Sequence, residues 1–149
     1  MDEKRIAERV ARALKAEGQY DSLNDAAAAT GNPGYALGLT LLFYMKPATW
    51  RDLSLGYDFA ARNGRLPDPD DLYRTHVLLG GIKERNLNRV FAMMQGEAWS
   101  PGGEANRLIR ANGLHHTSMS VGDVVTTGRG RVYMVDMAGF VNLVDGTKV

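Results

Sequence analysis

The chain contains no cysteine among its 149 residues. This absence excludes disulfide bonds, thiolate nucleophiles and zinc sites built on cysteine, and it suits a reducing compartment. Long hydrophobic runs are also missing. The longest, residues 35–45, is well short of the roughly twenty residues that a membrane-spanning helix needs, so we expect no membrane association. The first ten residues lack the apolar core of a signal peptide, so we expect a cytoplasmic protein.

An excess of charge of one sign is absent as well. The chain has 18 Lys/Arg and 17 Asp/Glu, which gives a net charge of +1. Residues 1–71 carry nine basic and eleven acidic side chains, and residues 72–149 carry nine and six. Strong nucleic-acid binders usually have a pI above about 9, whereas the pI of this chain is about 8.0. Charge therefore permits a phosphate-bearing partner without favouring one.

The N-terminal part of the chain, residues 1–66, shows mainly helical patterns. Apolar side chains recur at helical spacing in residues 3–17 and 50–62, and an alanine-rich run covers residues 25–30. Residues 35–45 are apolar on all sides, and the length of this run favours a buried helix over a strand. We therefore predict a helical N-terminal region.

A change in composition follows at residues 67–71, where two prolines and three aspartates form the best linker candidate. Beyond it, glycine-rich joints separate short apolar runs. We predict in order a strand, two helices and three strands, over residues 72–79, 86–94, 104–111, 119–126, 131–136 and 140–144. The predicted fold is α+β: the helical N-terminal region, then a β-α-α-β-β-β module over residues 72–149 in which a small antiparallel β-sheet packs on two helices.

The stretch from residue 94 to residue 125 is the densest in polar and turn-forming residues. Trp99 lies in a Ser-Pro-Gly-Gly loop, where an indole either anchors the loop on the core or stays exposed as a binding hot spot. Ser118 belongs to a run of hydroxyl residues. These hydroxyls would either contact a ligand or form hydrogen bonds with the backbone of neighbouring helices and turns. Both readings stay open for each residue.

Four arginines lie near this stretch. Arg107 and Arg110 belong to the second predicted helix of the module, and Arg129 and Arg131 flank Gly130 at the tip of a predicted hairpin. Together they would form a basic surface for phosphates or for an acidic protein patch. The alternative is that they are solvated charges on a short hairpin and a short helix.

Adjacent His115 and His116 suggest a metal site at first sight. Neighbours on an extended strand point to opposite faces, so both rings cannot easily bind one ion. The helical His-Glu spacing of metalloproteases is absent, and His76 lies on a different predicted strand. We expect a structural or surface role for the histidines, with no metal and no other cofactor.

The sequence offers no convincing catalytic constellation. It has serines, histidines and acids but no G-x-S-x-G turn of the hydrolase type. We assign no catalytic residue and expect binding in preference to catalysis. One hydrolase alternative stays open, in which His116 works with Glu97 or Asp123, and it requires the paired side chains to lie within about 3 Å of one another.

Three segments have distinctive sequence motifs: M-Q-G-E-A-W-S-P-G-G-E-A over residues 94–105, H-T-S-M-S-V-G-D-V over 116–124 and V-D-M-A-G-F over 135–140. Together they resemble a signature of small uncharacterised bacteriophage and mobile-element proteins, and of YodL-like modules in large polyvalent proteins of such elements. The resemblance covers residues 72–144, and Asn106 stands where that signature has arginine. It implies a phage-like origin and action in the bacterial cytoplasm, and it implies no reaction.

These observations predict a non-enzymatic accessory protein that binds a bacterial or phage protein and inhibits or redirects bacterial defence or gene expression. The contact residues we expect are Trp99, Arg107, Arg110, His115, His116, Ser118, Arg129 and Arg131. Nucleic-acid binding through the arginines is an alternative. A homodimer is another, through the apolar residues Tyr35, Leu39, Leu42 and Phe43.

Overall fold

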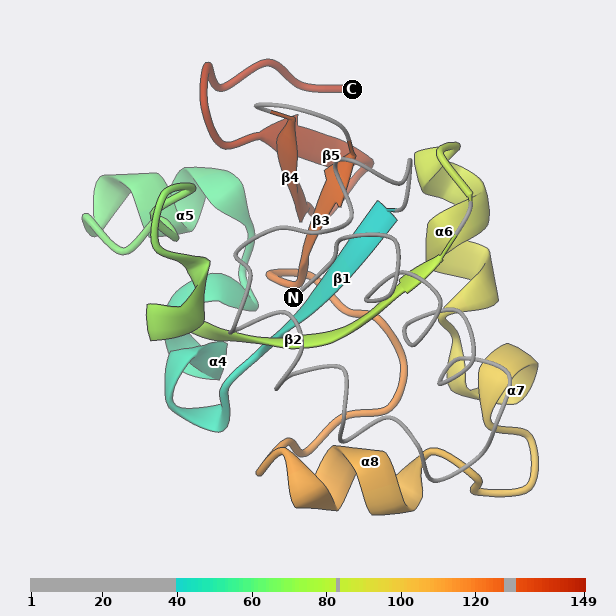
Figure 1. Ribbon diagram of the computed structural model, residues 1–149. Helices are drawn as coiled ribbons and strands as arrows, with labels where there is room; N and C mark the ends of the chain where they lie inside the picture. The colour runs from blue at the N-terminus through green and yellow to red at the C-terminus, as the bar shows by residue number, and fades with distance from the viewer. Residues whose placement is uncertain (1–39, 83, 128–130) are drawn as a thin grey trace, which may run out of the picture.

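The computed structural model describes residues 40–82, 84–127 and 131–149. These residues build a five-stranded antiparallel sheet with the strand order β2-β1-β3-β4-β5, accompanied by several short helices (Figure 1). The strands are β1 (Thr40–Met45), β2 (His76–Ile82), β3 (Val124–Thr127), β4 (Val132–Val135) and β5 (Phe140–Asn142). The predicted α+β class is confirmed. The helices predicted over residues 3–17 and 25–30 lie outside the described residues.

Strand β1 is an inner strand of this sheet, and it corrects the prediction of a buried helix over residues 35–45. Residues 40–45 form a strand that pairs with β2 on one side and with β3 on the other. All six of its residues are buried. A strand covered on both faces has no polar side, so the alternation that identifies a half-exposed strand is missing.

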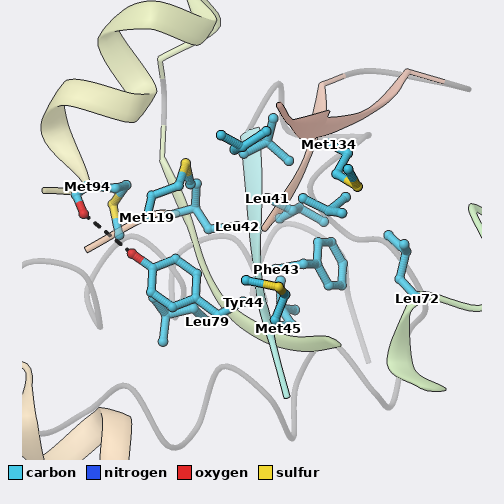
Figure 2. Packing of buried hydrophobic residues seen from close by; sticks show 14 of the residues in the cluster. Leu41, Leu42, Phe43, Tyr44, Met45, Leu72, Leu79, Met94, Met119 and Met134 are labelled. Carbon is cyan, nitrogen blue, oxygen red and sulfur yellow. Dashed lines mark hydrogen bonds between the residues drawn. The ribbon is translucent and has the colours of Figure 1, made fainter. Parts of the chain in front are cut away.

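The side chains of β1 alternate between two parts of the core. Figure 2 shows Leu42 and Tyr44 on the side of the strand that carries Met94 and Met119, with Phe43 on the other side. Leu42 and Phe43 are almost completely inaccessible to solvent inside the core of their own chain. The expected homodimer contact cannot use these two side chains, and its other two residues lie outside the described part of the chain.

The segment of residues 67–71 lies between β1 and β2 in the sequence. These two strands nevertheless pair directly, from Thr40 opposite Ile82 to Met45 opposite His76. Residues on both sides of the predicted linker therefore contribute to one sheet and one core. The strand predicted over residues 72–79 begins later than expected, at His76, because Leu72–Arg74 form a 3-10 turn (η2).

The helices are short. They are α4 (Trp50–Leu53), α5 (Tyr57–Arg62), α6 (Leu87–Met93), α7 (Gly96–Trp99) and α8 (Asn106–Ala111), and a 3-10 turn, η1 (Pro47–Thr49), precedes α4. The single helix predicted over residues 50–62 is wrong. Gly56 has a φ angle of 98°, which interrupts the helix and separates α4 from α5.

The helices predicted after the linker are confirmed with small changes in their ends. Asn86 caps α6 as expected, since its side chain accepts a hydrogen bond from the backbone N–H of Arg89 at 3.1 Å. In α8 the two residues predicted to face inward, Leu108 and Ile109, are buried. The helix ends before Gly113, which has a φ angle of 67°.

Gly122 joins the loop before β3 to the rest of the core. Its φ angle is 99°, and a Cβ atom there would lie 2.5 Å from the sulfur of Met45 and 2.8 Å from Cβ of Leu53. Both the backbone conformation and the space therefore require glycine.

We expect the substitution Gly122→Ala to lower the free energy of unfolding by about 3 kcal/mol, because left-handed strain and overpacking each cost about 1–2 kcal/mol. Gly113→Ala is the matched control. Gly113 also has a positive φ angle, but no atom lies within 4 Å of its Cβ position, so only strain of about 1 kcal/mol is expected. Urea unfolding followed by circular dichroism measures both losses, and equal losses would contradict the packing argument.

Candidate functional site

The candidate site is the loop of residues 116–123, which connects α8 to β3, and a fully buried carboxylate organises it. Asp123 accepts hydrogen bonds from the backbone N–H groups of Met45 and Ser120, both at 2.8 Å. The Nε2 atom of His116 lies 2.9 Å and 3.0 Å from the two carboxylate oxygens. The two backbone partners are N–H donors, which suits an ionised carboxylate that only accepts.

His116 is held between two aromatic rings. Its imidazole stacks on Tyr44, with ring centroids 4.7 Å apart and an angle of 11° between the planes. Trp50 meets the imidazole edge-on at a centroid distance of 5.0 Å. Only 11% of the His116 side chain is exposed. Carboxylate and aromatic contacts together fix both the position and the orientation of this ring.

The contact with Asp123 also determines where the proton of neutral His116 resides. A carboxylate accepts only, so Nε2 carries the hydrogen and Nδ1 presents a lone pair. Within residues 40–82, 84–127 and 131–149, Nδ1 has no hydrogen-bond partner. The hydrolase alternative required His116 and Asp123 to lie within about 3 Å of one another. In the structure Nε2 of His116 lies 2.9 Å and 3.0 Å from the two carboxylate oxygens.

Two aromatic side chains anchor the start of the loop. The hydroxyl of Tyr44 donates to the carbonyl of Thr117 at 2.8 Å, and Nε1 of Trp99 donates to the same carbonyl at 3.0 Å. Burial, together with the nearby charge of Asp123, raises the pKa of Tyr44, so its hydroxyl remains a donor. Trp99 is half-buried against the core, and its indole N–H holds the start of the loop 116–123.

The loop is also tied to the turn between α6 and α7. Ser118 accepts a hydrogen bond from the backbone N–H of Gly96 at 2.7 Å. The backbone N–H of Met119 donates to the carbonyl of Met94 at 3.0 Å, and the side chain of Gln95 donates to the carbonyl of Met119 at 3.2 Å. The segments 94–105 and 116–124, which carry the phage-like wording, are therefore in direct contact with one another.

His76 supports the end of the loop from strand β2. Its Nε2 donates to the carbonyl of Gly122 at 2.8 Å, so its Nδ1 accepts from the hydroxyl of Thr75 at 2.7 Å. Burial lowers the pKa of His76, and the ring is neutral in the folded protein. This histidine has the structural role that the sequence predicted.

The basic residues do not share one surface. Arg107 and Arg110 are exposed on α8, and Arg131 is exposed at the start of β4. Figure 1 shows α8 at the bottom of the view and β4, which follows Arg131, in the upper part. Arg129 lies outside the described residues. His115, unlike its neighbour His116, is exposed.

Two residues of the site, Tyr44 and Trp50, were not predicted from the sequence. Tyr44 was hidden in the run assigned to a helix, and Trp50 precedes an ordinary amphipathic pattern. A weak signal was available, since both aromatic residues flank the Lys-Pro break at which the apolar run ends.

The chemistry open to this site is limited. The serine hydroxyls are engaged elsewhere, since Ser118 binds the N–H of Gly96 and Ser120 donates to the carbonyl of Ser118 at 3.0 Å. No group of three His, Asp or Glu side chains in the described ranges could hold a metal ion. The site therefore offers one oriented imidazole.

Among the described residues, no helix is both long and apolar enough to cross a membrane.

We expect the stability of the protein to fall as the pH drops below about 6.5. Unfolded His76 takes up a proton near its ordinary pKa of about 6.5, whereas buried His76 resists protonation, so the unfolded state binds more protons in this range. The free energy of unfolding then decreases by at most about 1.4 kcal/mol per pH unit from this residue. Urea unfolding at pH 7.5, 6.5 and 5.5 measures the effect.

His76→Gln is the control for this prediction. Glutamine can still donate to the carbonyl of Gly122 but does not titrate, so its variant loses less stability between pH 7.5 and 5.5. The same slope in wild type and variant would show that His76 is not the source of the acid sensitivity.

Comparisons of the chain with models of protein families, with curated proteins and with solved structures find no match.

Proposed function

We propose that the protein is an accessory protein of a phage or related mobile element and that it acts by binding another protein. The origin is supported by the wording of residues 94–105, 116–124 and 135–140. The mode of action is supported by what the site does with its polar groups. The side chains of Trp99, Ser118 and Asp123 are committed to contacts inside the chain, so recognition rests on other residues.

The observation that carries the proposal is a group of exposed apolar side chains, here named the apolar corner. Trp50, Leu55 and Met137 are 41%, 59% and 69% exposed. Trp50 begins α4 and Leu55 follows the end of this helix. Met137 packs against Gly56, the residue that follows Leu55. A Cβ atom on Gly56 would lie 3.0 Å from Cγ of Met137. The corner combines residues from both halves of the chain.

The apolar corner has the properties of a protein contact. Tryptophan is the residue type most enriched among the hot spots of protein interfaces, and methionine adapts to the shape of a partner. The indole of Trp50 is already fixed against His116, so little side-chain freedom is lost when a partner covers it. Partner binding through this corner therefore starts from an ordered surface.

The partner class we propose is a bacterial protein of the defence or gene-expression machinery, which is where an accessory protein of a phage-like element would act. Nucleic-acid binding is less well supported. Arg107 and Arg110 form one exposed pair on α8, and Arg131 directly precedes β4, a strand that Figure 1 shows well away from α8. Two contacts to phosphate give weak binding with a shallow dependence on salt.

We expect the double substitution Trp50→Ser and Leu55→Ser to weaken partner binding at least tenfold, because truncation of a hot-spot tryptophan alone costs about 2 kcal/mol or more. A crosslinking amino acid at position 55 in the wild-type chain identifies the partner in bacterial cells, and titration calorimetry with that partner measures the loss. Met93→Ser is the matched control, since Met93 is 44% exposed on α6, away from the corner.

Two outcomes contradict the proposal. One is that no single partner is crosslinked in cells in which the protein is folded. The other is that the partner binds the double variant and the Met93→Ser variant with the same affinity as wild type, which would place its contact elsewhere on the surface.

A further inference from the structure

We infer that His116 and Asp123 form a catalytic dyad, in which Nδ1 of His116 acts as a general base on water that attacks a carboxylic ester bound against Trp50. This inference goes beyond partner binding and concerns His116, which contacts Trp50 of the apolar corner. His116 is the catalytic residue and Asp123 is a positioning residue, because the carboxylate acts through the imidazole.

The first support is the orientation of the imidazole. Asp123 holds the Nε2–H of His116 with both carboxylate oxygens, at 2.9 Å and 3.0 Å. The backbone N–H groups of Met45 and Ser120 fix the carboxylate in turn. A base that is oriented by a third, buried group is the recurring arrangement of nucleophilic and general-base sites. Nδ1, the nitrogen that would act as the base, has no hydrogen-bond partner among the described residues.

The second support is the surroundings of the free nitrogen. The His116 side chain retains 11% exposure, and the neighbouring indole of Trp50 is 41% exposed. An exposed indole beside a base provides a planar surface on which an aromatic group of a substrate can stack. Tyr44 covers the opposite face of the imidazole and keeps it from turning.

The third support concerns the nucleophile. The hydroxyls of Ser118 and Ser120 are bonded to Gly96 and to the carbonyl of Ser118, and neither contacts His116. Water is therefore the group that the base activates. Nδ1 takes a proton from water while the water oxygen forms a bond to the ester carbonyl carbon. The imidazolium, stabilised by the carboxylate of Asp123, then gives this proton to the leaving oxygen as the carbon–oxygen bond breaks.

The test is hydrolysis of p-nitrophenyl acetate by the full chain, followed through the release of p-nitrophenolate. His116→Gln is the informative variant, because its amide can still donate to Asp123 but has no basic nitrogen. We expect it to lose at least tenfold of the protein-dependent rate, since a positioned general base contributes about 10²–10⁴-fold. His115→Gln removes an exposed imidazole next to it in the sequence and keeps most of the rate.

Equal rates for the two glutamine variants would overturn the inference, provided that circular dichroism and urea unfolding show both to be folded. A second measurement does not depend on any substitution. Long-range ¹H–¹⁵N correlation spectra at pH 8 report the tautomer of each histidine, and His116 is expected in the Nε2–H form, whereas exposed His115 shows a mixture. A predominant Nδ1–H form of His116 would also overturn it.

Discussion

The buried carboxylate of Asp123 is the constraint on which the described part of the structure depends. An ionised group away from water costs several kcal/mol unless hydrogen bonds replace its hydration. Here the replacements come from the end of β1, from the loop itself and from an imidazole ring. The end of β1 and the loop before β3, which includes His116, must therefore meet at one point. The need to satisfy one charge fixes them together.

The same logic explains the polar density of residues 94–125. A loop that passes next to the core needs partners for its backbone groups, because it has no neighbouring strand to supply them. Tyr44 and Trp99 supply donors to the carbonyl of Thr117, and Gln95 supplies one to Met119. Most of the polar residues in this stretch therefore build the fold, and recognition is left to side chains that the pattern did not single out.

The parts of the fold that the sequence predicted correctly are those with local causes. Asn86 caps α6, Gly113 ends α8, and glycine-containing joints separate the last strands, so each boundary depends on a few adjacent residues. Strand β1 was not predictable in this way. Its strand conformation depends on pairing with segments about forty and eighty residues further along the chain, and a fully apolar run is compatible with a helix or a strand.

In the candidate site, too, contacts between residues close in the sequence were predicted, whereas contacts between distant segments were not. The pairing of His116 with Asp123 was one of the alternatives, because a short separation in sequence keeps two side chains within reach of one another. The contribution of Tyr44 and Trp50 depends on how β1 lies against the loop, and no local pattern contains that information. Trp99, which stood out in the sequence, is half-buried against the core, whereas Trp50, which did not, is 41% exposed.

Structural and chemical roles of His116 make different demands on the ring. A structural tie needs only one N–H donor for Asp123, and an amide would provide it as well. A base needs the second nitrogen, free of hydrogen and reachable by water. Trp50 connects this requirement to partner binding, because its indole touches the imidazole and belongs to the apolar corner. The two proposals, partner binding at the corner and general-base chemistry at His116, therefore concern side chains that touch one another, and a partner bound on Trp50 is expected to affect both.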